Sequence, residues 1–181
     1  MLVLNGTTGV DKVQDASIYP EDLVQKMTLM TAQTASGTSI NFTGIHSWAK
    51  RITVMFNYVS LSGTSNILVQ VGNSSGIITT TYSSSGVAIS TAVSNSTAGS
   101  ATTAGFMIPV SVASYAVSGL LLINKLSESY ISSSFQLGGT NDVRCGGGGI
   151  LITPTLDRVR ITTVNGTDTF DAGIINIMYE G

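Results

Sequence analysis

Apolar and polar residues alternate along several short stretches of this chain. The clearest stretch is 51–58, whose alternate residues are expected to share one face: Ile52, Val54, Phe56 and Tyr58. Four more stretches alternate in the same way: Asn66–Val71, Tyr130–Leu137, Arg158–Val164 and Ile174–Tyr179. In these the residues expected to point inward are Ile67, Val69, Val71, Ile131, Phe135, Leu137, Val159, Ile161, Ile175, Ile177 and Tyr179. A period of two residues is typical of half-buried strands, so the pattern predicts strands throughout.

Clusters of Ser, Gly, Asn and Thr separate the alternating stretches. They lie at Ser60–Asn66, Gly72–Gly76, Ser83–Gly86, Ser94–Thr103 and Gly138–Gly149, and each is interpreted as a turn. No amphipathic helix of three turns interrupts them, which argues against a parallel α/β fold. The pattern therefore predicts an all-β domain over residues 31–181, an antiparallel β-sandwich of jelly-roll type.

The first thirty residues differ from this pattern. They hold six of the eighteen charged residues of the chain. The stretch Tyr19–Leu23 resembles a helix start, with proline just inside and acidic residues in the first turn, and any helix would end near Met27. Residues 1–30 are therefore expected to form an extended arm with a short helical turn. Its expected docking contacts are Ile18, Tyr19, Pro20 and Leu23.

Charged residues make up only 10% of the chain, against about 25% in ordinary globular domains. The outward positions of the predicted strands carry Thr, Ser, Asn and Met instead of Lys and Glu. Edge strands of monomeric proteins usually carry charges that prevent sheet-to-sheet association, and this chain has few available. The simplest solution is a homo-oligomer that covers the edges.

Composition also argues against several function classes. The net charge is −2 and no basic stripe exists, so nucleic-acid binding is not expected. The most apolar run, Gly119–Ile123, is much shorter than the roughly 20 residues of a membrane span. The N-terminus lacks the pattern of a signal peptide, so the protein is expected to stay in the cytoplasm of the cell that makes it. One cysteine, Cys145, excludes an internal disulfide framework. The five Asn-x-Ser/Thr sequons are interpreted as a by-product of the Ser/Thr-rich composition.

Asn165-Gly166 is the strongest local signal. Between two alternating stretches it predicts a type I′ hairpin turn, since both central positions tolerate positive φ. Asp168 and Asp171 follow it and leave three interpretations: turn residues, which we favour, calcium ligands, or an acid/base pair for glycoside cleavage. The stretch around them is too short for an EF-type ligand series.

Asp157, Arg158 and Arg160 concentrate charge at the start of a predicted strand. The two arginines should share one strand face, and guanidinium groups suit carboxylates at interfaces. Asp157, Asp171 or a neighbouring subunit is a candidate partner, and a solvated strand face is the simpler alternative. Together with the Asn-Gly turn these residues are interpreted as a scaffold hairpin that fixes strand register.

Other chemistry-bearing residues are isolated. His46 is the only histidine, so a catalytic triad would have to be built on it, and one His with one Cys gives no zinc site without carboxylates. Arg144 next to Cys145 could lower the thiol pKa, but an inert loop thiol is the favoured interpretation. Gly146–Gly149 lacks the Lys-Ser/Thr of a phosphate loop and is expected to be a flexible connection. Trp48 is expected to plug one end of the sandwich, with sugar or base stacking as the alternative. No catalytic residue, metal or cofactor is predicted.

Two blocks carry a family resemblance. They are SGTSINFTGIHSWAKRITVMFNYVSLSGTSNILVQVG, residues 36–72, and TLDRVRITTVNGTDTFDAGIINIMYEG, residues 155–181. Together they resemble a β-rich module of tailed-bacteriophage virion structural proteins, met most often at the C-terminal ends of tail-fibre-like proteins. The resemblance covers residues 31–181, with a variable middle over 77–134. It implies no catalytic residues, and it places recognition in the Ser/Gly-rich loops.

The resemblance implies a non-enzymatic protein of the virion surface, made in the host cytoplasm and expected to be a homotrimer. A capsid decoration protein would use residues 1–30 to dock on the major capsid protein. A receptor-binding tip would instead contact tail proteins and a host surface receptor. Tips usually hang from a shaft built on heptads or fibrous repeats, and this chain has none. Decoration is therefore the favoured role, the tip is the alternative, and a polysaccharide depolymerase is a remote one.

Overall fold

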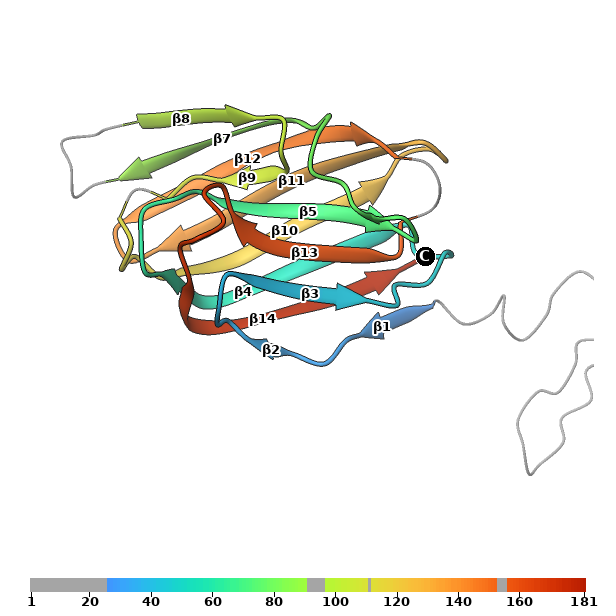
Figure 1. Cartoon of the computed structure of the whole chain (residues 1–181), viewed down its shortest axis with the longest axis horizontal. Coiled ribbons are helices and arrows are strands. Elements are labelled where there is room, and N and C mark those ends of the chain that lie inside the picture. The colour runs from blue at the N-terminus through green and yellow to red at the C-terminus, as the bar shows by residue number, and fades with distance from the viewer. Residues whose placement is uncertain (1–25, 91–96, 111, 153–155) are drawn as a thin grey trace, which may run out of the picture.

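The computed structural model describes residues 26–90, 97–110, 112–152 and 156–181. Two antiparallel sheets, one of nine strands and one of five, face each other across these ranges (Figure 1). The prediction of an all-β sandwich is confirmed, while the jelly-roll type of its connections stays a prediction. The expected docking residues Ile18, Tyr19, Pro20 and Leu23 lie outside the described ranges. Residues 27–29, assigned to the arm from the sequence, form an edge strand of the large sheet.

The large sheet places strands from both ends of the chain side by side. In spatial order its strands are β1 (Met27–Leu29), β14 (Phe170–Glu180), β4 (Arg51–Leu61), β10 (Val117–Lys125), β11 (Tyr130–Gly139), β12 (Asp142–Leu151), β7 (Ser83–Ser90) and β8 (Thr97–Thr102), with β2 (Gln33–Thr34) also pairing β14. The small sheet is built from β3 (Ser39–Thr43), β13 (Arg158–Thr163), β5 (Ile67–Asn73) and β6 (Gly76–Ile77), with β9 (Phe106–Ile108) also pairing β5.

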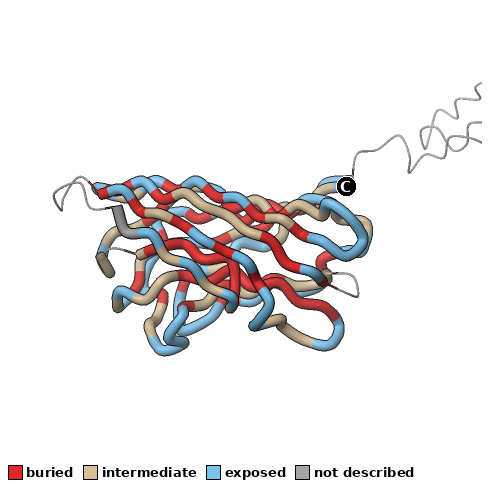
Figure 2. Tube along the Cα trace, turned by 90° about the horizontal axis from the view of Figure 1, so that it is seen from above, coloured by how far each residue is buried: buried red, intermediate tan, exposed pale blue. Residues whose placement is uncertain are grey.

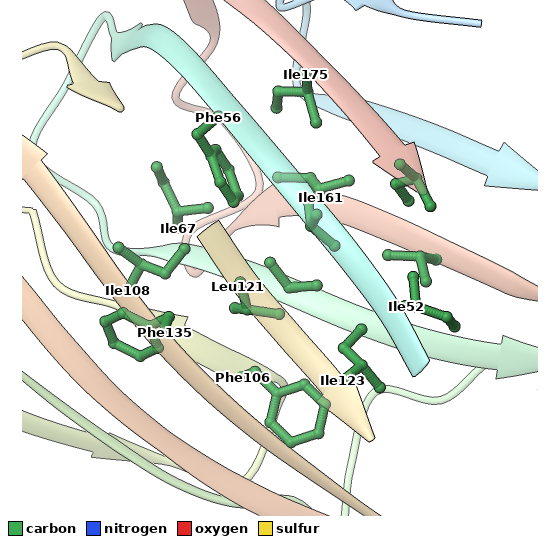
Figure 3. Close-up of a cluster of buried hydrophobic side chains, with 14 of the residues drawn as sticks. Ile52, Phe56, Ile67, Phe106, Ile108, Leu121, Ile123, Phe135, Ile161 and Ile175 are labelled. Carbon is green, nitrogen blue, oxygen red and sulfur yellow. The ribbon is translucent and has the colours of Figure 1, made fainter. Parts of the chain in front are cut away.

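A continuous apolar layer fills the space between the sheets. Buried and exposed residues alternate along the strands, as the tube in Figure 2 shows. In the close-up of Figure 3, side chains from both sheets meet in one cluster, among them Phe56, Leu121 and Ile175 of the large sheet and Ile67 and Ile161 of the small one. The inward positions predicted for β5, β11, β13 and β14 are all buried, which confirms the period-two interpretation of these strands.

Strand β4 departs from its prediction at Tyr58. Ile52, Val54 and Phe56 are buried as expected, but the Tyr58 side chain is 72% exposed and its φ is +55°. The pairing of β4 with β10 and of β14 with β4 also shifts register near this point. A bulge adds one residue and reverses which side chains face inward, so Val59 and Leu61 are buried beyond it.

Three of the predicted turn clusters lie within strands. Ser83–Gly86 begins β7, part of Ser94–Thr103 forms β8, and Gly146–Gly149 lies inside β12 instead of forming a flexible connection. The glycines of β12 suit their neighbours, because a Cβ at Gly146 would stand 2.7 Å from Cζ of the Phe135 ring. Glycine composition signals a turn in most sequences, but here Gly146 and Gly149 make room for aromatic side chains of β11. A Cβ at Gly147 or Gly148 would instead meet the backbone of a neighbouring strand.

The predicted hairpin around Asn165-Gly166 is wrong. Strand β13 pairs with β3 and β5 in the small sheet, whereas β14 pairs with β1, β2 and β4 in the large one. Residues 164–169 are therefore a corner that carries the chain from one sheet to the other. Register within each sheet comes from lateral pairing and not from this connection.

The sandwich has two distinct ends. Strand β14 runs from the corner to the C-terminus, and its 11 residues at about 3.3 Å each separate the two ends by roughly 35 Å. We call the end formed by Lys26, Trp48 and Gly181 the arm pole, since the N-terminal segment enters the sandwich there. The opposite end, where the described connections 35–38, 62–66, 112–116, 140–141 and 164–169 lie, is the loop pole (Figure 1).

Replacing Gly173 by alanine should destabilise the protein. Gly173 adopts φ +96° beside the β4 bulge, and an added Cβ would lie 2.6 Å from the carbonyl carbon of Tyr58. We expect a loss of about 2 kcal/mol or more in the free energy of unfolding, measured by urea denaturation. Gly138→Ala is the matched control, because a Cβ there meets no atom within 4 Å. Equal costs for the two variants would contradict this account of the bulge.

Candidate functional site

Asp157 and Arg158 form an ion pair at the entrance of β13. Arg158 donates from Nε to Oδ1 of Asp157 at 2.6 Å and from Nη2 to Oδ2 at 3.0 Å. The hydrogen bond from Arg158 lowers the pKa of Asp157, and the same bond raises the pKa of Arg158. The backbone of Asp157 donates to Gly72 and accepts from Ile45, so the pair sits where three segments meet. Of the candidate partners, Asp157 is therefore the one that Arg158 takes.

Arg160 lies on the same face of β13 as Arg158, as the alternation predicts. Its partner is an amide, because Nε donates to Oδ1 of Asn41 at 3.0 Å on the neighbouring strand β3. Asp171 belongs to the other sheet, where its carboxylate accepts a hydrogen bond from the Ser60 hydroxyl. The structure thus separates the two arginines from Asp171 and brings Asp171 to β4.

Asn165 shapes the corner with its side chain. The N–H of Gly166 donates to the carbonyl of Thr163, which makes Val164 and Asn165 the central residues of the turn. Gly166 has φ +68°, but Asn165 has no positive φ, so the predicted type I′ turn is wrong. Oδ1 of Asn165 accepts from the backbone N–H groups of Thr167 and Asp168, each at 3.0 Å. An asparagine that bonds the backbone beyond it explains why the chain turns toward the other sheet.

Asp168 joins two connections that cross between the sheets. Its carboxylate accepts from the backbone N–H of Ser65 at 2.9 Å and from Nδ2 of Asn165 at 2.8 Å. Ser62 and Thr169 add a further pair of hydrogen bonds between the same two connections, each 2.9 Å long. The bond from Asn165, followed by that from Ser65, lowers the pKa of Asp168. Asp168 therefore acts as a clamp at the loop pole that holds the β4–β5 and β13–β14 connections together.

A buried ion pair between Asp142 and Arg144 is the feature that the sequence analysis missed. The two side chains are 0% and 1% exposed, and Nη2 of Arg144 donates to Oδ2 of Asp142 at 2.9 Å. Nη2 also lies 3.5 Å from the carbonyl of Tyr115 in connection 112–116. Two opposite charges two positions apart on one strand share a face, so this spacing indicates an ion pair. The sequence analysis interpreted residues 138–149 as a turn, and in a turn the same spacing does not place the two side chains on one face. The pair holds connection 112–116 against the core.

Trp48 and His46 form an aromatic cluster at the arm pole. Their rings stack with centroids 5.8 Å apart, Tyr179 packs against both, and Nζ of Lys26 lies 6.0 Å from the Trp48 centroid. Trp48 is partly buried against the core, as expected for a plug at the end of the sandwich. The ring of His46 is part of this packing, which gives the only histidine a structural contact.

Metal-binding and membrane-spanning features were sought in the described ranges. There, no group of three or more His, Cys, Asp or Glu side chains is arranged to hold a metal ion. No helix within these same residues is long and apolar enough to cross a membrane. Cys145 is a free, partly buried thiol in β12 and not in a loop. A pocket at the arm pole is lined by Ala49, Lys50, Ile52, Ile123, Lys125, Ser127, Glu128, Ile131, Ile152 and Leu156.

Comparisons with protein-family models, with curated proteins and with solved structures give no match for this chain. The resemblance to phage virion modules therefore stays a prediction from the two sequence blocks. Any functional argument depends on the chain's own residues.

Breaking the buried ion pair should be strongly destabilising. Arg144→Met leaves the Asp142 carboxylate buried without its cation, which costs about 3–5 kcal/mol in comparable sites. Replacing both residues, as Asp142→Leu with Arg144→Met, should recover most of that loss. Urea unfolding measures all three proteins, and Arg160→Met, at a partly exposed guanidinium, is the control expected to cost less than about 1 kcal/mol. A loss for Arg144→Met as small as that of the control would contradict the role given to the pair.

The lowered pKa of Asp168 predicts a specific loss of stability in acid. Because the carboxyl pKa is lower in the folded than in the unfolded chain, its stabilising contribution is full above about pH 4. That contribution disappears as the pH falls through the folded-state pKa. The stability difference between the wild type and Asp168→Asn should therefore shrink on acidification.

Variants at the hydrogen-bond partners of Asp168 and Asp157 test the cause of the lowered pKa of Asp168. Asn165→Ala removes the largest cause of the shift at Asp168, so its pKa should rise toward the ordinary value, measured by carboxyl-carbon NMR titration. Arg158→Gln should raise the pKa of Asp157 and leave that of Asp168 unchanged. An unchanged Asp168 pKa in Asn165→Ala would refute the clamp.

Proposed function

We propose that this chain is a non-enzymatic structural protein of the bacteriophage virion surface, and specifically a capsid decoration protein. The sandwich would form a knob, and the N-terminal segment would dock it on the major capsid protein. Three copies would assemble as a homotrimer. The loops of the opposite end would face outward from the particle.

The observation that carries this proposal is the separation of the two poles. The chain enters the sandwich at Lys26, whose carbonyl accepts the N–H of Gly181 and whose ammonium lies by Trp48. The connections rich in hydroxyl and amide groups lie at the far end of β14 (Figure 1). An N-terminal docking segment would therefore leave the loop pole directed away from the shell. The surface that docks on the capsid and the surface that faces the surroundings would then lie at opposite ends of the sandwich.

The pairing of the two resembling blocks gives further support. Residues 36–72 form β3, β4 and β5, and residues 155–181 supply β13 and β14. In the small sheet β13 lies between β3 and β5, and in the large sheet β14 lies beside β4. Two blocks far apart in sequence thus build one continuous half of the sandwich. Their resemblance to a single module is consistent with this shared structural unit.

A receptor-binding tip is the second candidate, favoured by the loop pole itself. Five of the described connections meet there, and two of them are fixed by the Asp168 clamp. Recognition loops work best on a rigid scaffold, which this arrangement provides. A polysaccharide depolymerase would need Asp168 and Asp171 as a catalytic pair. Each of these carboxylates instead bonds to a different neighbouring connection or strand, which favours the structural roles.

Removing residues 1–25 should abolish capsid binding and leave the knob folded. The deletion ends before β1, so the pairing of Met27–Leu29 with β14 is kept. Binding to purified capsids lacking the protein is measured by co-sedimentation, with circular dichroism as the folding check. A variant carrying residues 1–25 in scrambled order is the matched control and should also fail to bind. If the truncated protein still decorates capsids, docking through the N-terminal segment is wrong.

Antibody labelling of whole particles separates the two candidate roles. Gold label over the head supports decoration. Label at the tail end overturns decoration in favour of the receptor-binding tip. Absence of label from intact particles, with the protein present in the infected cell, overturns both roles.

A further inference from the structure

Exposed apolar side chains gather on one face of the large sheet. We call the outer face the set of large-sheet residues that point away from the small sheet, identified by register from the buried positions. Among the described residues, eleven large hydrophobic side chains are exposed, and eight of them belong to this face: Met27, Leu29, Ile89, Leu120, Tyr130, Val143, Leu151 and Ile174. Scattered exposed hydrophobics are ordinary, but their concentration on one face marks an interaction surface.

The outer face is almost free of charge. Arg51 and Glu180 lie on it at the arm pole, where they neutralise each other at 2.9 Å. Asp171 lies near its other end, on β14. Between them the described outward positions of β14, β4, β10, β11, β12, β7 and β8 carry no charged side chain. A partner recognised by its charge would find little to pair with on this surface.

The outward side chains differ in size between two parts of the outer face. Large side chains stand on the half formed by β14, β4 and β10, and we call this the outer ridge: Met55, Leu120, Leu122 and Met178. Small side chains occupy the outward positions at the centre of β12, β7 and β8, and we call the hollow there the outer trough. It is lined by Ser85, Val87, Gly99, Ala101 and Cys145, with Gly86, Ser100 and Gly146, which point inward by register, between them. Ile89, Val143 and Leu151 stand beyond its two ends. Leu120 and Leu122 also border a second hollow beside β11, with Ser134 and Gln136. Larger side chains in one part of a face and a hollow in another can fit a copy of the same chain.

We propose that a second copy of this chain covers the outer face, with the outer ridge of one copy seated in the outer trough of the next. Around a threefold axis the outer ridge of each copy contacts the outer trough of the next copy. Three such contacts close the ring. Symmetric assembly brings equivalent groups close together, so a face with few charged side chains limits like-charge repulsion. The contact also covers the apolar side chains that the isolated subunit leaves exposed.

This inference rests on the proposed function for the number of copies, but its test needs no phage particle. Sedimentation velocity of the purified full chain should give one species of three times 18.7 kDa across micromolar concentrations. A monomer overturns the inference and leaves the outer face to a different partner, such as the capsid shell. Antibody labelling of particles is a separate measurement, so the proposed virion location can be refuted or supported whatever the oligomeric state of the purified chain.

Two charge substitutions test the surface. Leu120→Lys places a charge on the outer ridge and Ala101→Glu places one in the outer trough, and each should yield monomers. Val164→Lys is the matched control, since Val164 is 52% exposed against 48% for Leu120 but lies in the loop-pole corner. The control should remain oligomeric. Oligomers that persist in both outer-face variants would place the contact elsewhere and overturn the inference.

The double variant tests the seating of ridge in trough. Within one subunit β10 and β8 are four strands apart, roughly 19 Å, so the two new charges cannot pair there. Between subunits they face each other, and Leu120→Lys with Ala101→Glu should restore the oligomer. Failure of this rescue, with both single variants folded, overturns the ridge-in-trough arrangement.

Cys145 gives an independent readout in the same proteins. It lines the outer trough, and the chain has one cysteine, so the rate of thiol labelling reports on this surface alone. Labelling should be roughly tenfold slower in the wild type than in Leu120→Lys, following the fraction of assembled protein. Equal rates in folded wild type and variant would overturn coverage of the trough.

Discussion

The packing of one sheet's apolar face against the other is the interaction on which the rest of this structure depends. Side chains such as Val54, Leu121 and Ile161 lose almost all their exposure in that layer. Burial of this kind is the dominant favourable contribution to folding, and a chain with 10% charged residues has few other strong interactions. The local irregularities of the strands keep the apolar side chains of this layer buried.

Three such irregularities determine the shape of the sandwich. The bulge at Tyr58 reverses the facing of β4, so that Leu61 reaches the core at the loop pole. The corner at Asn165 sends the chain from the small sheet to the large one, and Asp168 fastens it to the other crossing connection. The buried pair of Asp142 and Arg144 brings charge into the apolar layer only where each charge has its counterpart. These features create a loop pole that is held by hydrogen bonds and ion pairing.

The proposed function uses this geometry in a simple way. Lys26 lies at the arm pole, and the loop pole lies roughly 35 Å away. The outer face, which is almost free of charge, runs between them. Each of the three surfaces can serve one partner: the particle, the surroundings and a second copy. The shortage of charge that is unusual for a monomer becomes understandable when an entire sheet face is covered by assembly.

Alternation of apolar and polar residues was sufficient to predict the class of fold and the inward faces of its regular strands. Period-two alternation requires only that one face be buried, which is why Ile175, Ile177 and Val159 could be placed without coordinates. The residues of the Asp168 clamp could likewise be selected, because Asn-Gly and Asp are local turn signals. Three features became apparent only in the folded protein: which strands pair, that residues 164–169 form a corner and not a hairpin, and that Gly146–Gly149 belongs to a strand. These outcomes depend on contacts between residues far apart in the chain, such as Phe135 beside Gly146, and local patterns carry no information about them.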